Sequence, residues 1–556
     1  MDKILISVLR GSFITACDEM GLALLRTTRS PWLNAARDFS ISLFDADRRL
    51  VAQADFIPIL VGTSRFALEG VFSRFGNDIH PGDAIILNDP SFGGNHLSDI
   101  TLVYPIFFED RLAYWVVNKA HFADIGGCVA GGCNTHAQEI FQEGMRLPPV
   151  KLYDRYVLNS GLKDFLLLNV REAETFWADL ESLVASAKTG ERKIHSLLKK
   201  YGKEALFSSH DVIFEAGEAE LHTELKKIPE GTYRGRATLE MEPSTTKADV
   251  NVDVAITIRD GSIHFDYAGT HPQVASFVNS PLANTYSATC VALFSVLDAD
   301  IRRNEGTAQC ISVTAPEGSL LNPAATAPVA LCTLTTAEVV IEACWHALSE
   351  TIATRVPCGW ARTATPITFG KDPRTERWYT MGHFLTHGGA GAVHAHDGWS
   401  YLAPTVCMGA LTKPNVETIE TDYPYRILAH EFAQDSCGAG TYRGGMGTLY
   451  RMSPIGHRAE GVLRADGMRT APYGLQGGRP GRTTQAKIIR RDGSQVVLSG
   501  KAAFTLNQDE VFESTTSGGG GWGDPKRRSR DLIMRDLEDQ LISEEHARRE
   551  FAGVRD

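Results

Sequence analysis

Two short segments share the pattern His-x-x-Asp, and their residue types and spacing suit metal chemistry. The first runs from His96 to Asp99 after an irregular, glycine-containing stretch, and the second runs from His121 to Asp124 before a pair of glycines. Imidazole and carboxylate groups are ligands that Mn, Fe and Zn ions accept in proteins. If the fold brings the segments together, they indicate a divalent metal centre, with irregular backbone on both sides that leaves room for water or substrate.

The residues between the two segments predict how they meet. Residues 100–107 and 112–118 are rich in β-forming side chains and flank the polar pair Glu109-Asp110, which predicts a β-hairpin. Counted outward from a two-residue turn, the pairs are Ser98 with His121, Asp99 with Ala120, and His96 with Ala123. Both segments then lie at the open end of one hairpin. The alternative is that these polar residues only cap the strand ends and hold the loops by hydrogen bonds.

Apolar periodicity predicts the elements around this hairpin. Helical spacing occurs at residues 3–26, 166–201 and 337–355, with Gly190 as an expected interruption of the second helix. Short strands are expected at 39–44, 50–52, 84–87, 232–240, 250–258 and 262–267. Beyond residue 355 the chain is glycine-rich and strand-like to about residue 525. Two short helices follow at 531–541 and 543–551, with Ser543 as the N-cap of the second.

This order of elements predicts a mixed α/β (α+β) fold, a β-rich multi-domain subunit with N-terminal and C-terminal helices. A chain of 556 residues exceeds the size at which single cores stop growing, so two or three domains are expected. The character of the sequence changes near Ile228. The expected domains are residues 1–228, which contain the metal site, residues 229–525, a glycine-rich β domain with the embedded helix 337–355, and residues 526–556, a helical tail.

Composition excludes several classes of protein. The chain carries 67 acidic and 56 basic side chains, a formal net charge of −11, which argues against binding to nucleic acid. It has no apolar run of about 18 residues that would predict a membrane span. The sequence shows no signal-peptide pattern, so a cytoplasmic protein with its ten cysteines reduced is expected. Glycine is in excess at 51 residues, and it gathers beside the polar motifs, where it permits close backbone approach.

Other catalytic patterns have little support. The sequence has neither a G-x-S-x-G nucleophile elbow nor a G-x-x-x-x-G-K-[ST] phosphate loop. The segment 518–523 matches a dinucleotide fingerprint in form, but Pro525 interrupts the helix that would have to follow, so a structural turn is expected. Four histidines surround another glycine loop, where they could form a second polar site or stand incidentally: His383, His387, His394 and His396.

A series of short motifs runs along almost the whole chain. They are Arg37-Asp38-Phe39-Ser40, Asn88-Asp89-Pro90, His96-Leu97-Ser98-Asp99, the segment 121–127, Glu143-Gly144-Met145-Arg146, Ala268-Gly269-Thr270-His271, the segment 318–323, Arg443-Gly444-Gly445 and the segment 518–525. By their number and order the chain resembles the hydantoinase B/oxoprolinase family, the B-type parts of ATP-dependent N-methylhydantoinases, caprolactamases and 5-oxoprolinases. That family is similar to the metal-binding subunit of acetone carboxylases.

The resemblance implies cofactors and a partner. An A-type subunit with an actin-like ATPase fold is expected to bind ATP and Mg and to phosphorylate the substrate carbonyl oxygen. The expected assembly is an A2B2 heterotetramer. By position, His96, Asp99 and His121 match the family's metal ligands, and Asp38 matches a fourth, carboxylate ligand. The divalent metal would be Mn, Zn or Fe.

The implied reaction is ATP-dependent opening of a small cyclic amide such as a hydantoin, a lactam or 5-oxoproline. Phosphorylation makes the unreactive amide an electrophile, which a metal-bound water then attacks. His121 and Asp124 are the candidate catalytic residues, with Asp124 orienting His121 or moving a proton. Two alternatives stay open. The chain could belong to an ATP-dependent ketone carboxylase, which shares the metal motif, or it could be a non-catalytic scaffold for the ATPase subunit with a structural metal.

One residue departs from the family's pattern. Many relatives carry His-His-Ala-Asp where this chain has His121-Phe122-Ala123-Asp124. Any role of a second histidine as a ligand or proton carrier is therefore vacant, which leaves room for a different substrate.

Overall fold

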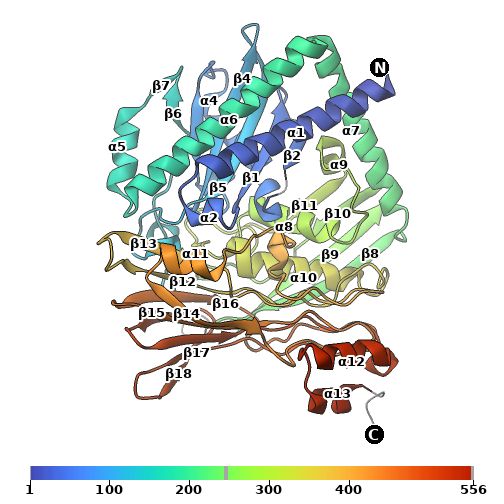
Figure 1. Ribbon diagram of the computed structural model, residues 1–556. Coiled ribbons are helices and arrows are strands. Elements are labelled where there is room, and N and C mark those ends of the chain that lie inside the picture. Colours follow the sequence, from blue (N-terminus) through green and yellow to red (C-terminus); the bar gives the residue numbers. More distant parts are fainter. Residues whose placement is uncertain (1, 55, 243–247, 552–556) are drawn as a thin grey trace. The chain divides into compact units, whose positions relative to one another are not determined.

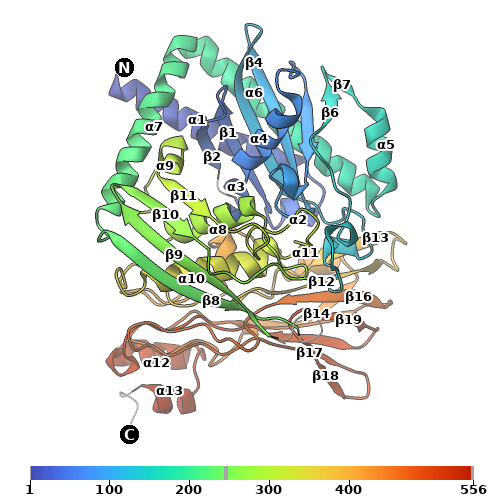
Figure 2. The same ribbon diagram turned by 180° about the vertical axis from the view of Figure 1, so that it is seen from behind.

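The computed structural model describes residues 2–54, 56–242 and 248–551 and divides into two compact units. Unit 1 contains Met1–Tyr233 and Val254–Thr333, and unit 2 contains Arg234–Asp253 and Leu334–Asp556. Figures 1 and 2 show the elements from opposite sides. Among the described helices, none combines the length and the apolar character that crossing a bilayer requires. The domain boundaries expected at residues 228 and 525 stay predictions.

A seven-stranded antiparallel sheet is the centre of unit 1, with the strand order β2-β1-β5-β4-β3-β6-β7. Its strands are β1 (Phe39–Asp45), β2 (Leu50–Ala54), β3 (Ala84–Leu87), β4 (Asp99–Phe108), β5 (Arg111–His121), β6 (Val150–Asp154) and β7 (Val157–Leu158). β3 and most of β4 read as apolar runs rather than as alternating patterns, because both faces of the sheet are covered. The strands predicted at 39–44, 50–52 and 84–87 are confirmed.

Helices cover this sheet on both faces (Figures 1 and 2). They are α1 (Lys3–Thr27), α2 (Pro31–Asn34), α3 (Pro58–Val61), α4 (Ser64–Phe75), α5 (Ser160–Leu168), α6 (Ala173–Tyr201) and α7 (Lys203–Leu225). Side chains of α1 and α6, such as Phe13 and Leu183, join the larger core on one face. On the other face, Leu68 of α4 packs in a second cluster with Trp115. The hairpin β4–β5 is therefore held from both sides.

The predictions for the helices of residues 160–225 need correction. The single helix predicted at 166–201 is two helices, α5 and α6, with a break at 169–172. Gly190 does not interrupt α6: a Cβ there would lie 2.3 Å from the Met20 sulfur, so the glycine lets α1 cross closely. The sequence pattern does not predict α7, because its buried face includes Ser209, His210 and Gly217, which dilute the apolar periodicity.

The hairpin β4–β5 forms as predicted, but its register differs by one residue. Phe108 pairs with Arg111 around the expected turn, and a bulge after Ile106 then shifts all the pairs beyond it. Asp99 therefore lies opposite His121, so the predicted pairs Ser98–His121 and Asp99–Ala120 are wrong. A shift of one residue moves a side chain to the other face of a sheet. The bulge thus puts Asp99 and His121 on the same face.

A four-stranded sheet follows, with the order β11-β10-β9-β8. Its elements and the two helices beside them in sequence are β8 (Gly231–Leu239), β9 (Val250–Arg259), β10 (Ser262–Asp266), α8 (Leu282–Phe294), α9 (Glu305–Gln309) and β11 (Ile311–Thr314). β8 and β9 have residues in both units, whereas β10 and β11 belong to unit 1. β10 pairs antiparallel with β9 and parallel with β11. The strands predicted at 232–240, 250–258 and 262–267 are confirmed.

Two antiparallel sheets build most of unit 2, with the orders β13-β12-β16-β19 and β14-β15-β20-β17-β18. Their strands are β12 (Ala364–Lys371), β13 (Trp378–Gly382), β14 (Tyr425–Phe432), β15 (Thr448–Pro454), β16 (Ala459–Ala465), β17 (Gln485–Ile489), β18 (Gln495–Val497), β19 (Ala503–Leu506) and β20 (Val511–Thr515). Leu463 of the first sheet and Phe512 of the second belong to one hydrophobic cluster, so the sheets pack face to face.

The helices of unit 2 are α10 (Ala337–Leu348), α11 (Val416–Asp422), α12 (Arg530–Glu538) and α13 (Glu544–Glu550). α10 ends seven residues before the predicted Arg355, where the Ser349 hydroxyl donates to the carbonyl of His346 at 2.9 Å. Both C-terminal helices are confirmed, and Ser543 caps α13 by accepting the His546 N–H at 3.1 Å. The predicted mixed α+β class with helices at both ends of the chain is confirmed.

Glycine-rich loops of unit 2 stack backbone directly on backbone. A Cβ at Gly444 would lie 1.8 Å from the carbonyl oxygen of Gly519, and one at Gly519 would lie 1.9 Å from that of Ala390. Hydrogen bonds join the same segments, with the Gly445 N–H donating to Ala390 at 2.8 Å and the Gly519 N–H donating to Gly445 at 2.9 Å. The glycine excess of the sequence therefore serves close packing in this region.

Candidate metal centre

The two His-x-x-Asp segments meet in unit 1, at the open end of the hairpin β4–β5. Donor atoms of His96, Asp99 and His121 lie within 4.8 Å of one another. The two carboxylate oxygens of Asp99 divide between the imidazoles: Oδ2 lies 3.2 Å from His96 Nδ1, and Oδ1 lies 3.1 Å from His121 Nδ1. The three residues are at most 7% exposed.

The local backbone explains this convergence. Asp99 is the first residue of β4 and His121 the last of β5, and the shifted register makes them a cross-strand pair. The Asp99 N–H donates to the carbonyl of His96 at 3.1 Å, a turn that brings His96 back over the strand end. The ring of Trp32 stacks on that of His121 with centroids 4.8 Å apart. Each donor is thus oriented by a neighbouring element.

The electrostatics of the group favour a cation. Burial raises the pKa of Asp99, but His96, His121 and Lys119 outweigh it and hold the pKa below its usual value, so the carboxylate is charged. Asp99 Oδ2 is buried and accepts no hydrogen bond from the part of the chain that the structure describes. Two imidazoles and one charged carboxylate fit a divalent ion.

Asp38, the predicted fourth ligand, lies just before β1 and is half-buried. Its backbone carbonyl accepts the His121 N–H at 3.0 Å, and its own N–H donates to the carbonyl of Trp32 at 3.0 Å. At this end of the hairpin, the donor atoms found within 4.8 Å of one another are those of His96, Asp99 and His121. Asp38 therefore holds the end of β5 through its backbone, and its role as a ligand stays a prediction.

Asp124, the predicted proton carrier, is buried and anchors the loop after β5. One oxygen, Oδ1, accepts the Gly126 N–H at 3.1 Å and also a guanidinium N–H of Arg171 at 3.1 Å. The other accepts the backbone N–H of Arg171. Arg171 in turn donates to the carbonyl of Gly127 at 2.7 Å. The structure thus ties Asp124 to the break between α5 and α6, and its predicted catalytic role is untested.

Lys119 is a buried cation that the sequence analysis missed. It precedes His121 by two residues on β5, so both side chains share a face of the sheet. Its ammonium donates to Asn95 Oδ1 at 2.6 Å and to the Thr63 hydroxyl. Burial lowers the pKa of Lys119 to about 8, against the opposing effect of Asp99. The sequence could have indicated this, because alternation along β5 puts Lys119 on the same face as His121. A lysine on a buried face of an apolar strand needs polar partners.

Glu143 is a second buried ionisable residue. The sequence analysis names it only as part of a family motif and gives it no role. Its carboxylate accepts the backbone N–H groups of Val329 and Ala330, each at 2.9 Å. Burial nevertheless raises the pKa of Glu143 to about 8. Both Glu143 and Asp99 raise the pKa of the buried Cys332 thiol, after the larger effect of its burial. The protein interior near the candidate metal site therefore contains further ionisable groups, Glu143 and Cys332.

Phe122 is the residue that departs from the pattern expected from the family resemblance. Its ring is buried and packs against that of Phe176 in α6, with centroids 5.0 Å apart. In this chain the position therefore contributes to the hydrophobic core.

A cavity of about 490 Å³ opens in unit 1 beside the loop that leads to His96. Much of its wall is apolar, and it includes Phe66, Pro90, Phe92, Gly93, Ile140, Pro281, Leu282 and Val329. Its volume lies in the range of small-molecule sites.

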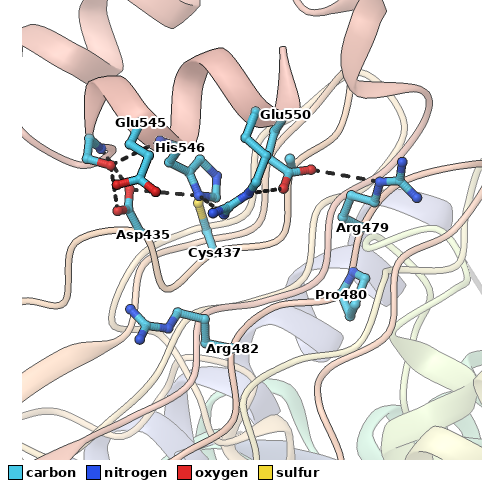
Figure 3. Close-up of a pocket in the computed structure, with 11 residues that line it drawn as sticks. Asp435, Cys437, Arg479, Pro480, Arg482, Glu545, His546 and Glu550 are labelled. Atoms are coloured by element: carbon cyan, nitrogen blue, oxygen red, sulfur yellow. Dashed lines mark hydrogen bonds and ion pairs between the residues drawn. The ribbon is translucent and has the colours of Figure 1, made fainter.

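A second cavity, of about 360 Å³, lies in unit 2 between α13 and the glycine-rich loops (Figure 3). Figure 3 shows Arg482 on the opposite side of the pocket from Glu545 and His546. Arg549 pairs with Glu550 at 2.8 Å, so much of the lining charge is already balanced. This pocket contains none of the residues singled out from the sequence as metal ligands.

Comparisons with known proteins concern the chain as a whole. The sequence model of the family described as "Hydantoinase B/oxoprolinase" matches residues 2–525. The caprolactamase subunit beta of Pseudomonas jessenii is 32% identical over 563 aligned residues, which cover 100% of this chain and 97% of that one. The crystal structure of ATP-dependent caprolactamase from Pseudomonas jessenii gives a TM-score of 0.92 at 32% identity, covering 99% and 96% of the two chains. Nucleotide-free acetone carboxylase gives 0.91 at 19% identity, covering 99% and 79%, and so shares the fold.

Proposed function

The chain belongs to the hydantoinase B/oxoprolinase family, and from this premise we propose that it is the B-type subunit of an ATP-dependent enzyme that opens a small cyclic amide. The observation that carries the proposal is the buried group His96, Asp99 and His121, in a chain that aligns along its whole length with a caprolactamase beta subunit. The proposed substrate is a hydantoin, a lactam or 5-oxoproline.

In this proposal His96, Asp99 and His121 hold a divalent ion, Mn, Zn or Fe, with Asp38 as a fourth ligand. When bound, such an ion supplies Lewis-acid activation of a water or of the amide carbonyl oxygen. Asp99 keeps both imidazoles facing one point, which reduces the reorganisation needed on binding. Lys119 places a positive charge close to Asp99 within the same buried region, and so limits the cost of burying the carboxylate.

Asp124 is proposed as a positioning residue. Its contacts with Gly126 and Arg171 fix the loop directly after His121. A loop fixed in this way keeps the imidazole at the end of β5 in one orientation, as groups beyond the direct ligands do in other metal sites. His121 is proposed to act directly, as a ligand that contacts the reacting group.

The partner is inferred from the chemistry. An amide is a poor electrophile, and phosphorylation of its oxygen creates a leaving group and a reactive carbon. The sequence contains no P-loop for ATP, and the relative with 32% identity is named as a beta subunit. We therefore propose an A-type partner that binds ATP and Mg, in an A2B2 assembly.

The test is to produce this chain with its A-type partner and to measure ATP-dependent opening of caprolactam, hydantoin and 5-oxoproline, together with metal content. We expect turnover of at least one amide that needs both chains and ATP. His96→Ala and Asp99→Ala should each lower it by more than about 100-fold, which exceeds the usual loss from groups outside the ligand shell. Full activity in either variant would overturn the assignment of the site.

The same assay separates the two alternatives. Bicarbonate-dependent consumption of a ketone without amide opening would identify a carboxylase. A scaffold would be identified by ligand variants that lose thermal stability and binding of the A-type chain together, while any activity of the partner persists.

A further inference from the structure

A second group of metal-ligating side chains lies in unit 1, away from every motif discussed above. It consists of Glu218 and His222 on α7 and Cys310, which directly follows α9. Their donor atoms lie within 4.8 Å of one another. The Cys310 sulfur is 3.5 Å from His222 Nε2, and a Glu218 carboxylate oxygen is 3.9 Å from the same nitrogen.

The shared nitrogen indicates what this group can do. In a catalytic relay, the acid contacts the imidazole nitrogen opposite the one that faces the nucleophile. Here the carboxylate and the thiol both face Nε2, so three donors converge on one point. Tetrahedral bonds of about 2.3 Å to sulfur and about 2.0 Å to nitrogen place those two ligand atoms about 3.5 Å apart. The observed sulfur–nitrogen separation is the same.

The fold constructs this convergence from four elements. Glu218 and His222 are four residues apart on α7, so they share one face of the helix. α9 packs closely on α7, since a Cβ at Gly306 would lie 1.9 Å from the Phe214 carbonyl oxygen, and this brings Cys310 to the same face. The turn between β9 and β10 packs against the imidazole ring of His222, because a Cβ at Gly261 would lie 2.8 Å from that ring. The imidazole is thus oriented.

We propose that Glu218, His222 and Cys310 bind a thiophilic divalent ion, of which Zn²⁺ is the biological candidate. Thiolate with imidazole and carboxylate suits Zn²⁺ and disfavours Mg²⁺ and Ca²⁺, which prefer oxygen ligands. Binding displaces the thiol proton to solvent. Cys310 is 6% exposed while Glu218 and His222 are half-exposed, so solvent can supply a fourth ligand. The ion would tie the C-terminal part of α7 to the start of β11. This proposal is independent of the proposed activity.

The test uses the full chain with His96→Ala, which disables the first site, and Co²⁺ as the probe. We expect one Co²⁺ per chain and a thiolate-to-cobalt charge-transfer band. Cys310→Ser in the same background should abolish the band, whereas the matched control Cys128→Ser, at an exposed cysteine, should retain it. Absence of the band in the His96→Ala chain, or its persistence in Cys310→Ser, would overturn the proposal.

A second pair of variants keeps the thiol intact, in case Cys310→Ser fails to fold. Glu218→Gln should lower the Co²⁺ affinity at least about tenfold. His264→Gln removes a histidine from β10 that instead bonds Ser312 at 2.8 Å, and it should leave the affinity unchanged. Equal affinity in both variants, with native circular dichroism, would exclude Glu218 as a ligand and overturn the three-residue site.

Discussion

The two donor groups of unit 1 are built in contrasting ways. His96, Asp99 and His121 come from one hairpin and the turn that leads into it, and they are almost fully buried. The pairing of Asp99 with His121 depends on the strand register set by a bulge. Glu218 and His222 come from regular helical spacing, and Cys310 reaches them only through the packing of α9 on α7. One group is buried among other charges, and the other is open to solvent at its edge.

The contrast between the two groups links the burial of each to its proposed role. Burying a carboxylate and a lysine together costs several kcal/mol of desolvation, which the surrounding fold must offset. A structural metal site does not require this burial of charge, because a metal at the edge of a helix can stabilise the fold by binding alone. We therefore propose a catalytic role for the first group and a stabilising role for the second, and the following predictions test these two roles.

The largest expected effect separates the two groups by activity. His96→Ala should reduce amide opening by more than about 100-fold, whereas Cys310→Ser should leave it within about twofold, since nothing we propose for Cys310 touches the substrate. Steady-state turnover with saturating A-type partner measures both. Equal losses of turnover in the two variants would contradict the separate roles proposed for the two groups.

The second prediction concerns pH and the buried surroundings of the first group. The pKa of Glu143 is raised to about 8 in the folded chain, whereas an unfolded chain releases this proton near about pH 4.3. The contribution of Glu143 to the free energy of unfolding is therefore fully present below about pH 4.3, and it is lost as pH rises through about 8. Glu143→Gln should remove this loss, which is on the order of a few kcal/mol.

Urea denaturation at several pH values between 5 and 9 measures the Glu143 effect. The free energy of unfolding of the wild-type chain should fall relative to that of Glu143→Gln as pH rises. A parallel pH dependence in both chains would show that Glu143 is not buried in its protonated form.

The third prediction concerns Lys119. Lys119→Met keeps the length of the side chain but leaves the Asn95 carbonyl and the Thr63 hydroxyl without their donor, so we expect a loss of about 1–3 kcal/mol in the free energy of unfolding. The control Lys199→Met, at an exposed position of α6, should change it by less than about 0.5 kcal/mol. Equal free energies of unfolding for the two variants, measured by urea denaturation, would show that the hydrogen bonds of Lys119 to Asn95 and Thr63 do not stabilise the fold.

The smallest expected effect belongs to the second group. In the His96→Ala background, added Zn²⁺ should raise the thermal midpoint by about 2–4 °C. The same increase should be absent after Cys310→Ser. Scanning calorimetry with and without Zn²⁺ measures it, and a shift that survives Cys310→Ser would assign it to another site.

The sequence predicts the first group because its information is local. Two His-x-x-Asp segments flank one hairpin, and a turn between apolar strands is enough to bring them together. The register was wrong by one residue because the bulge after Ile106 depends on tertiary packing, which no local pattern specifies. Lys119 could have been found from its alternation with His121, but a lysine in an apolar strand is ordinarily taken as an exposed residue.

The second group could not be predicted. Cys310 is 88 residues from His222, and α7, which carries two of the three donors, has Ser209, His210 and Gly217 on its buried face. Tertiary contacts, such as the close approach of Gly306 to α7, bring the segments together. Similarly, the general fold class followed from element order, whereas the apolar spacing continues past the observed end of α10, where the Ser349 hydroxyl bonds the His346 carbonyl.

The stacked glycine segments of unit 2 have a thermodynamic consequence. Gly389, Gly444 and Gly519 meet through carbonyls and N–H groups, with no side chains between them. Opening such a layer exposes peptide groups rather than apolar surface, and polar hydration lowers the heat capacity that apolar hydration raises. The cohesion of these loops should therefore vary little with temperature, and they should hold their shape in the cold while the hydrophobic clusters of the sheets weaken.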